Sequence, residues 1–123
     1  MKLKNSLYTV TTVDKSEASI TCAISLNSEH QIYKAHFPEL PITPGVCIIQ
    51  IGCELLNDAL GKNMTLCEVA NAKFLAVINP RDNYKIDYTF SKISTENGIC
   101  KVTVTVHHND VTFAKLSLRF KDE

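Results

Sequence analysis

Hydrophobic and polar residues alternate with a period of two along much of this chain. The alternation is most regular over residues 99–108, where Val102, Val104 and Val106 are separated by threonines. A period of two predicts a strand with one buried and one exposed face. Other segments rich in β-branched residues indicate further strands at 7–13, 18–26, 65–78, 83–93 and 111–120.

Two short polar pairs separate the last three of these segments. Asn97-Gly98 is a strong signal for a tight turn, and Asn109-Asp110 closes the next connection. We therefore expect the last three strands to form an antiparallel meander. Residues 31–37 are predicted to be a short extended piece that leads into the proline-containing segment after them.

One segment lacks the alternation and is apolar on nearly every side. Thr43 is a good N-cap, Pro44 suits the first helical position, and Gly61 suits the C-cap. A helix between them would have roughly 17 residues and a length of about 25 Å. Because a helix that is apolar all round is buried, we expect this one at the centre of the fold. Gln50 and Glu54 interrupt its apolar run.

One buried helix and a largely antiparallel sheet define an α+β architecture in which the sheet wraps around the helix. No linker, internal repeat or low-complexity stretch divides the 123 residues. We therefore expect a single domain over residues 1–123. The hydrophobic fraction of 45% is enough for a core without disulfide bonds.

Charge and cysteine content narrow the function classes. The formal net charge is zero, with 13 basic and 13 acidic side chains. Because nucleic acids and membrane surfaces attract proteins with a basic excess, neither partner is expected. The five cysteines show no C-x-x-C spacing, which is typical of a reduced intracellular protein. No segment has the apolar length of a signal peptide or membrane span, so we expect a cytoplasmic protein. No cofactor motif is present, and no cofactor or metal is expected.

The segment "HFPELPITPG" (36–45), followed by the apolar helix, carries a family resemblance. It resembles the FabZ/FabA family of 3-hydroxyacyl-[acyl-carrier-protein] dehydratases, which have the hotdog fold. The family pattern H-F-P-x-x-P-x-x-P-G-V is matched at His36, Phe37, Pro38, Pro41, Pro44, Gly45 and Val46. A second similar stretch spans 70–90 and has Arg81 where the family usually has glycine. The resemblance covers about residues 7–120, and it implies an antiparallel β-sheet wrapped around one long central helix.

The resemblance also implies a reaction, the elimination of water from a 3-hydroxyacyl thioester to a trans-2-enoyl thioester. His36 would be the base, because the unperturbed pKa of histidine is about 6.5. The backbone N–H of Gly45, at the positive end of the helix, would polarise the thioester carbonyl. Phe37, Pro44 and Val46 would line the substrate site.

Partners follow from the same resemblance. The acyl group would be linked to acyl carrier protein or to coenzyme A, and the pathway would be fatty-acid or related acyl-chain biosynthesis. The site would lie at the subunit interface of a homodimer, or of a higher assembly of such dimers.

The chain departs from the family at the acidic position. The family's acid falls fourteen residues after the histidine, where this chain has Gln50. An amide can orient water or a hydroxyl but cannot give up a proton near neutral pH. Glu54 lies one turn later on the same helix face, about 6 Å further along. We hypothesise that Glu54 takes over part of the acid's role, or that a water held by Gln50 relays the proton.

Plainer explanations exist for each of these residues. His36 can be a structural histidine in a loop. Gln50 and Glu54 can belong to a solvent-facing stripe that continues to Asn57 and Asp58, because this spacing marks the wet side of any amphipathic helix.

Structural roles explain three other candidate residues better than functional ones do. Cys47 lies close to the motif, but a core thiol explains it better than a Cys–His nucleophile does. His107 and His108 are adjacent in a strand and are predicted to face opposite sides, which makes them a poor metal-binding pair.

Three functions therefore remain. The leading interpretation is a lyase, a hydro-lyase of 3-hydroxyacyl thioesters, with catalytic residues His36, Gln50 and Glu54. The second is a catalytically impaired subunit that holds an acyl chain or pairs with an active relative. The third is a hotdog acyl thioesterase in which Glu54 activates water. Release of a free thiol would distinguish hydrolysis from dehydration.

Overall fold

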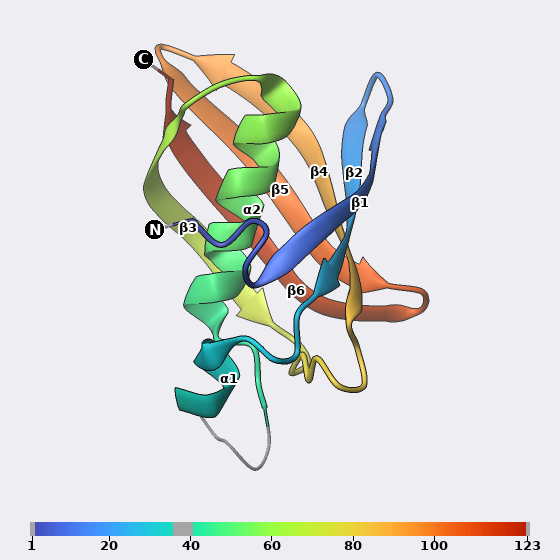
Figure 1. The fold of residues 1–123 in the computed structure, drawn as a ribbon. Coiled ribbons are helices and arrows are strands. Elements are labelled where there is room, and N and C mark those ends of the chain that lie inside the picture. The colour runs from blue at the N-terminus through green and yellow to red at the C-terminus, as the bar shows by residue number, and fades with distance from the viewer. Residues whose placement is uncertain (1, 36–40, 123) are drawn as a thin grey trace.

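The computed structural model describes residues 2–35 and 41–122. Within them, an antiparallel sheet with strand order β1-β2-β4-β5-β6-β3 curves around the helix α2 (Figure 1). This is the α+β hotdog architecture expected from the sequence. The elements are β1 (Tyr8–Lys15), β2 (Ser19–Leu26), α1 (Gln31–Ala35), α2 (Gly45–Leu60), β3 (Thr65–Phe74), β4 (Lys85–Glu96), β5 (Ile99–His108) and β6 (Val111–Lys121).

Strands occur in all six segments where the alternation predicted them, but two boundaries were wrong. The predicted strand 65–78 ends at Phe74, and the chain then leaves the sheet. The predicted extended piece 31–37 instead forms the short helix α1 up to Ala35. His30 explains this helix, because its ring Nδ1 accepts the N–H of Ile32 at 3.0 Å and its carbonyl accepts the next N–H.

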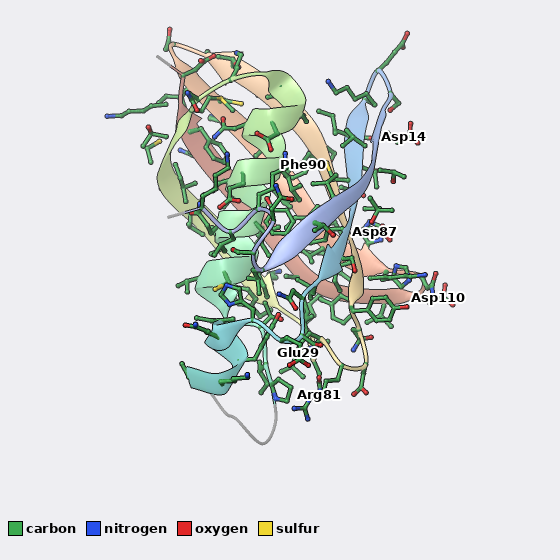
Figure 2. The ribbon with its side chains drawn as sticks, viewed as in Figure 1. Asp14, Glu29, Arg81, Asp87, Phe90 and Asp110 are labelled. Carbon is green, nitrogen blue, oxygen red and sulfur yellow. The ribbon has the colours of Figure 1, made fainter. Side chains whose placement is uncertain are left out.

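The core lies between α2 and the inner face of the sheet. Phe90, on β4, is fully buried there, whereas the exposed Asp14 and Asp110 lie at the margins of the sheet (Figure 2). The meander of the last three strands is confirmed, with β4 antiparallel to β5 and β5 antiparallel to β6. Asn97 and Gly98 both have positive φ in the turn that was predicted for them.

A buried hydroxyl fixes the helix to the sheet. Tyr88, on β4, donates its hydroxyl to the backbone carbonyl of Ile48 at 2.8 Å. The ring passes beside Gly52, where an added Cβ would lie at an ordinary contact distance of 3.5 Å. Burial raises the pKa of Tyr88, so this hydroxyl stays protonated and remains a donor.

The two ends of α2 differ in how well they were predicted. Gly61 is the C-cap in left-handed conformation, with φ 63°, as expected. At the other end the N-cap is Pro44 rather than Thr43, and no side chain caps the helix. Thr43 is buried instead, since its hydroxyl pairs with that of Tyr33 at 2.9 Å and its N–H donates to the carbonyl of Ile78. The hydroxyl that was expected to cap the helix therefore pairs with Tyr33 instead.

The cysteines behave as small apolar side chains, as predicted. All five lie in the described residues and are free thiols, and four of them are buried. The exception is Cys67, an exposed residue on β3.

Candidate active site

An apolar groove of about 540 Å³ opens at the start of α2. The residues that line it come from the segment before α2, the first helical turns, and the end of β3 with the chain that follows. They are Ile42, Thr43, Gly45, Ile48, Phe74, Leu75, Ala76, Val77 and Ile78. An apolar groove of this size suits a hydrocarbon chain.

At Gly45 the backbone packs directly against another residue of the groove lining, Phe74. A Cβ added there would lie 2.9 Å from Cζ of Phe74, which is closer than side-chain carbons approach in proteins. The absence of a side chain therefore lets the ring of Phe74 cover the start of the helix. Because Gly45 has no side chain, its backbone also presents no Cβ to a molecule bound in the groove.

Backbone donors point out of this end of the helix. The N–H groups of Cys47 and Ile48 both use the carbonyl of Pro44, at 3.0 and 3.1 Å. The N–H groups of Gly45 and Val46 lie in the first turn, where the helix itself supplies no acceptor for an N–H group. Together with the helix dipole, they make the start of α2 a favourable place for a carbonyl oxygen that gains negative charge.

Large apolar side chains are exposed around the groove. Val46 is 72% exposed, Val77 is 65% exposed, and Leu75 and Phe74 are about half exposed. β3 is an edge strand, and nearly all of its residues are exposed. An apolar patch beside an unpaired strand edge marks a surface that contacts another molecule.

Gln50 and Glu54 contact each other on the helix. The side-chain Nε2 of Gln50 donates to Oε2 of Glu54 at 2.8 Å. The sequence predicted that the two share a face, and the structure brings them into direct contact. Both are partly buried.

Glu54 also holds the N-terminal segment of the chain. Its Oε2 accepts the backbone N–H of Leu3 at 2.8 Å, and its Oε1 accepts the N–H of Lys4 at 2.9 Å and the hydroxyl of Tyr8 at 3.0 Å. Burial and the neighbouring Glu54 raise the pKa of Tyr8, so its hydroxyl acts as a donor. Sequence reasoning missed these three partners because they lie about fifty residues away in the chain.

The rest of the polar stripe also has defined partners. The side chain of Asn57 pairs with both the backbone N–H and the carbonyl of Met64, at 2.9 and 3.1 Å. Asp58 binds the ammonium of Lys4 at 3.0 Å. The stripe is therefore not simply a solvated face, since it fastens two segments of chain to the helix.

Several predicted site residues lie elsewhere or cannot be placed. His36 and Phe37 fall outside the described residues. Cys47 is buried, and burial raises the pKa of its thiol, which opposes a role as nucleophile.

The histidine pair at the end of β5 was predicted to face opposite sides, and this was wrong. His107 binds the hydroxyl of Thr89 at 2.8 Å, and His108 binds the carboxylate of Asp87 at 3.0 Å. Asp87 and Thr89 are two residues apart on β4 and share a face of the sheet, so both rings reach that same face. Within the described part of the chain, no group of three or more potential metal ligands occurs. No helix there is long and apolar enough to span a membrane.

In the second family-like stretch, 70–90, the local structure accommodates Arg81 where the family usually has glycine. The N–H of Arg81 donates to the side-chain oxygen of Asn79 at 3.0 Å, and Asn79 also accepts two later N–H groups through its carbonyl. Arg81 is not among the residues with positive φ, so the turn does not require glycine.

Comparison with solved structures gives the same fold. The dehydratase heterocomplex ApeI:P from Xenorhabdus doucetiae superposes with a TM-score of 0.73, at 13% identity, over 92% of this chain and 96% of that one. A hypothetical thioesterase with coenzyme A from Streptococcus pneumoniae gives a TM-score of 0.65 at 8% identity, over 97% of this chain and 90% of that one. At these identities the likeness concerns the fold alone.

Sequence comparison is more specific. The chain is 29% identical to a 3-hydroxyacyl-[acyl-carrier-protein] dehydratase FabZ from Chlamydia pneumoniae, over 93% of this chain and 80% of the relative. It is 32% identical to the FabZ of Thermotoga neapolitana, over 89% of this chain and 82% of the relative. The family model described as ApeI-like, ApeI dehydratase, matches residues 12–116. The chain therefore belongs to the ApeI-like family of hotdog dehydratases.

Proposed function

We propose that this chain is a dehydratase that converts a 3-hydroxyacyl thioester, carried by acyl carrier protein or coenzyme A, into the trans-2-enoyl thioester. The observation that carries the proposal is the groove at the start of α2, where the backbone of Gly45 lies among apolar side chains. An acyl chain fits the apolar walls, and the thioester carbonyl fits the N–H of Gly45. Membership of the ApeI-like family supports this choice.

The elimination needs one base and one stabilised oxygen. A base removes a proton from C2, the electron pair forms the C2–C3 double bond, and the C3 hydroxyl takes up a proton and leaves as water. The negative charge that develops on the thioester oxygen would be stabilised by the N–H of Gly45 and the helix dipole. We assign the base to His36 from its residue type and its place in the motif.

By the motif resemblance, Gln50 stands where the family has an acid, and an amide supplies no proton. We propose that Gln50 orients the leaving hydroxyl, and that His36 returns to that hydroxyl the proton it took from C2. The protons then balance without a second titratable group. A dedicated general acid contributes about 10²–10⁴-fold, so we expect turnover to be slower by up to that factor than with an acid at this position.

We propose that a second copy of the chain covers the groove by pairing along β3. In the β3–β6 register, Glu68 lies opposite Arg119 and Lys73 opposite Lys115, so both project from the outer face of the sheet. A two-fold pairing that places Glu68 opposite Lys73 of a second copy makes two opposite-charge contacts. The same register places Val69 opposite Ala72 on the inner face.

Charge reversal tests this pairing. Glu68→Lys is expected to weaken the dimer in sedimentation velocity at low salt, because it sets like charges opposite each other. Glu68→Lys combined with Lys73→Glu is expected to restore it. A wild-type chain that sediments as a monomer at assay concentration would overturn the proposed dimer.

A second function is favoured by one observation, the amide at position 50. In this alternative the chain is a non-catalytic subunit that pairs with an active dehydratase. The homologous ApeI:P structure is itself a heterocomplex. Such a subunit would show no turnover alone and would show turnover after its partner is added.

The assay follows the interconversion of a 3-hydroxyacyl thioester and its trans-2-enoyl product by enoyl absorbance, with wild type, His36→Ala and Gln50→Glu. The proposal predicts that wild type turns over, that His36→Ala does not, and that Gln50→Glu is at least as active as wild type. His108→Ala is the matched control, since it removes a histidine at the end of β5 rather than in the motif. Free thiol is measured in parallel, because its release would identify a thioesterase.

Each outcome selects one function. Activity lost only in His36→Ala supports the dehydratase. An inactive wild type with an active Gln50→Glu variant supports the non-catalytic subunit. Thiol release without enoyl formation overturns both.

A further inference from the structure

A second hollow, which is polar, lies on the outer face of the sheet over β4, β5 and β6. Its volume is about 260 Å³, and no described residue lines both this hollow and the groove at the start of α2. Among the described residues that line it, none is acidic. Three are cationic and three carry hydroxyls, namely Lys92, Lys101, Arg119, Ser94, Thr103 and Ser117.

The register of the sheet brings these side chains together. Lys101 on β5 lies opposite Ser94 on β4 and opposite Arg119 on β6. Thr103, two residues later on β5, lies opposite Ser117 on β6. Residues two apart on a strand share a face, and the residues of β5 that alternate with these are buried against the core. The cations and hydroxyls therefore project together from the outer face.

An irregularity in β4 adds Lys92 to this cluster. Between its pairs with Thr103 and Lys101, β4 has one more residue than β5, which is a β-bulge. Lys92 lies in the bulge with a positive φ of 52°. Glycine aside, the other described residues with positive φ are all asparagines, which tolerate this conformation better than lysine does. A bulge that holds an unfavourable conformation and re-aims a side chain is a feature found at functional sites.

The positive charges of the hollow are not balanced within it. Lys101 and Arg119 lie directly opposite each other, and like charges so placed destabilise a sheet. Arg119 is relieved by Glu68, whose carboxylate lies 3.2 Å away. Within the described part of the chain, no ion pair involves Lys92 or Lys101, although Glu17 lines a second hollow beside Lys92. The hollow thus keeps a positive excess in a chain whose net charge is zero.

We propose that this outer hollow binds a phosphate group, either as inorganic phosphate or as the phosphate of a small ester. Phosphate oxygens accept hydrogen bonds from several directions, which suits cations that come from three strands with hydroxyl donors between them. Sites that enclose a drug-sized ligand have about 300–1,000 Å³, so this hollow takes the charged group and leaves the rest of an ester outside. The bound anion would offset the repulsion between Lys101 and Arg119.

The test is a titration of nitrogen-15-labelled protein with sodium phosphate at constant ionic strength, followed by amide NMR. Saturable shifts are expected at Lys92, Lys101 and Arg119. Lys101→Gln and Lys92→Asn should each weaken phosphate binding by about 5-fold or more, and asparagine keeps the bulge because it tolerates positive φ. Lys115→Gln is the matched control. It removes a lysine from the outer face of β6 outside the hollow, and it should bind phosphate as wild type does.

Thermal unfolding separates a binding role of Lys101 from a structural one. Without phosphate, Lys101→Gln should keep or raise the melting temperature, because it removes a like charge opposite Arg119. A fall of more than about 4 °C would instead assign Lys101 to the fold and overturn the inference.

Two further ligands complete the titration. Acetate at the same ionic strength tests for charge alone, and shifts equal to those with phosphate would overturn the inference, as would phosphate shifts that do not saturate. Adenosine 3′,5′-bisphosphate distinguishes the sources. Tighter binding than inorganic phosphate, with shifts at the same three cations, supports the phosphate of an ester, whereas weaker binding supports inorganic phosphate. The enoyl assay is not a readout here, so the inference and the proposed dehydratase function stand or fall separately.

Discussion

Gly45→Ala would place a methyl group 2.9 Å from Cζ of Phe74 and 3.3 Å from its Cε2. Ordinary carbon–carbon contact is about 3.5–4.0 Å, so the ring must move by roughly 0.5–1 Å. Phe74 is 49% exposed, and its ring can turn outward without disturbing the core. Such a rotation costs about 0.5–1.5 kcal/mol. Replacing glycine by alanine in a helix also stabilises the helix by about 0.5–1 kcal/mol.

The free energy of unfolding should therefore change by less than about 1 kcal/mol, which corresponds to a shift in melting temperature of a few degrees. Turnover should fall far more than stability, because a displacement of about 1 Å near the reacting atoms can lower turnover by about 10²-fold. Thermal unfolding and the enoyl assay measure the two effects separately. We expect a near-normal melting temperature together with a large loss of turnover.

Gly52→Ala is the matched control. It makes the same change on the same helix, but the new Cβ would lie 3.5 Å from Cε2 of Tyr88, an ordinary contact. Its turnover should equal that of wild type. Full activity in Gly45→Ala, or a loss of more than about 2 kcal/mol of stability, would refute the assignment of Gly45 to the site rather than to the fold.

Two further predictions concern the core. Tyr88→Phe removes the hydrogen bond to the carbonyl of Ile48, and because that carbonyl keeps its intrahelical partner, the expected cost is about 0.5–1.5 kcal/mol in chemical denaturation. An unchanged unfolding midpoint would show that the bond contributes nothing. Exposed Cys67 should react with a thiol reagent at pH 8 well before Cys22 and Cys53, because burial raises the pKa of both to about 11. Mass spectrometry of partly labelled protein checks the order, and early labelling at Cys53 would contradict it.

Local patterns predicted the elements that local chemistry determines. The alternation of Val102, Val104 and Val106 identified β5, and the positive φ of Asn97 follows from its place in a two-residue turn. Gly61 closes the helix because glycine adopts the left-handed conformation without cost. These features depend on neighbours within a few residues, so the sequence contains the information.

Features that depend on distant contacts could not be predicted this way. Thr43 has the residue type of an N-cap, but its hydroxyl is taken by Tyr33 and its backbone by the chain after β3. Glu54 has the spacing of a solvent-facing residue, yet the N-terminal segment folds over it. Helix periodicity shows which side chains share a face, and it cannot show which segment of the chain covers that face.

The functional role of the site residues stays a prediction. The motif singled out Gly45 and Gln50, which the structure places in the lining of the groove and in contact with Glu54 respectively. The contact of Gly45 with Phe74 was not foreseeable, because the two lie on different elements and meet through the fold.

The most direct measurement of the central claim is isotope incorporation in the reverse reaction. A trans-2-enoyl pantetheine thioester is incubated with the protein in water enriched in oxygen-18 and deuterium, and the products are analysed by mass spectrometry. A dehydratase adds water across the double bond, so the account predicts a 3-hydroxyacyl thioester with oxygen-18 at C3 and deuterium at C2. The protein is used at stoichiometric concentration and is first shown to bind the thioester. Recovery of the thioester without either isotope would then contradict the account.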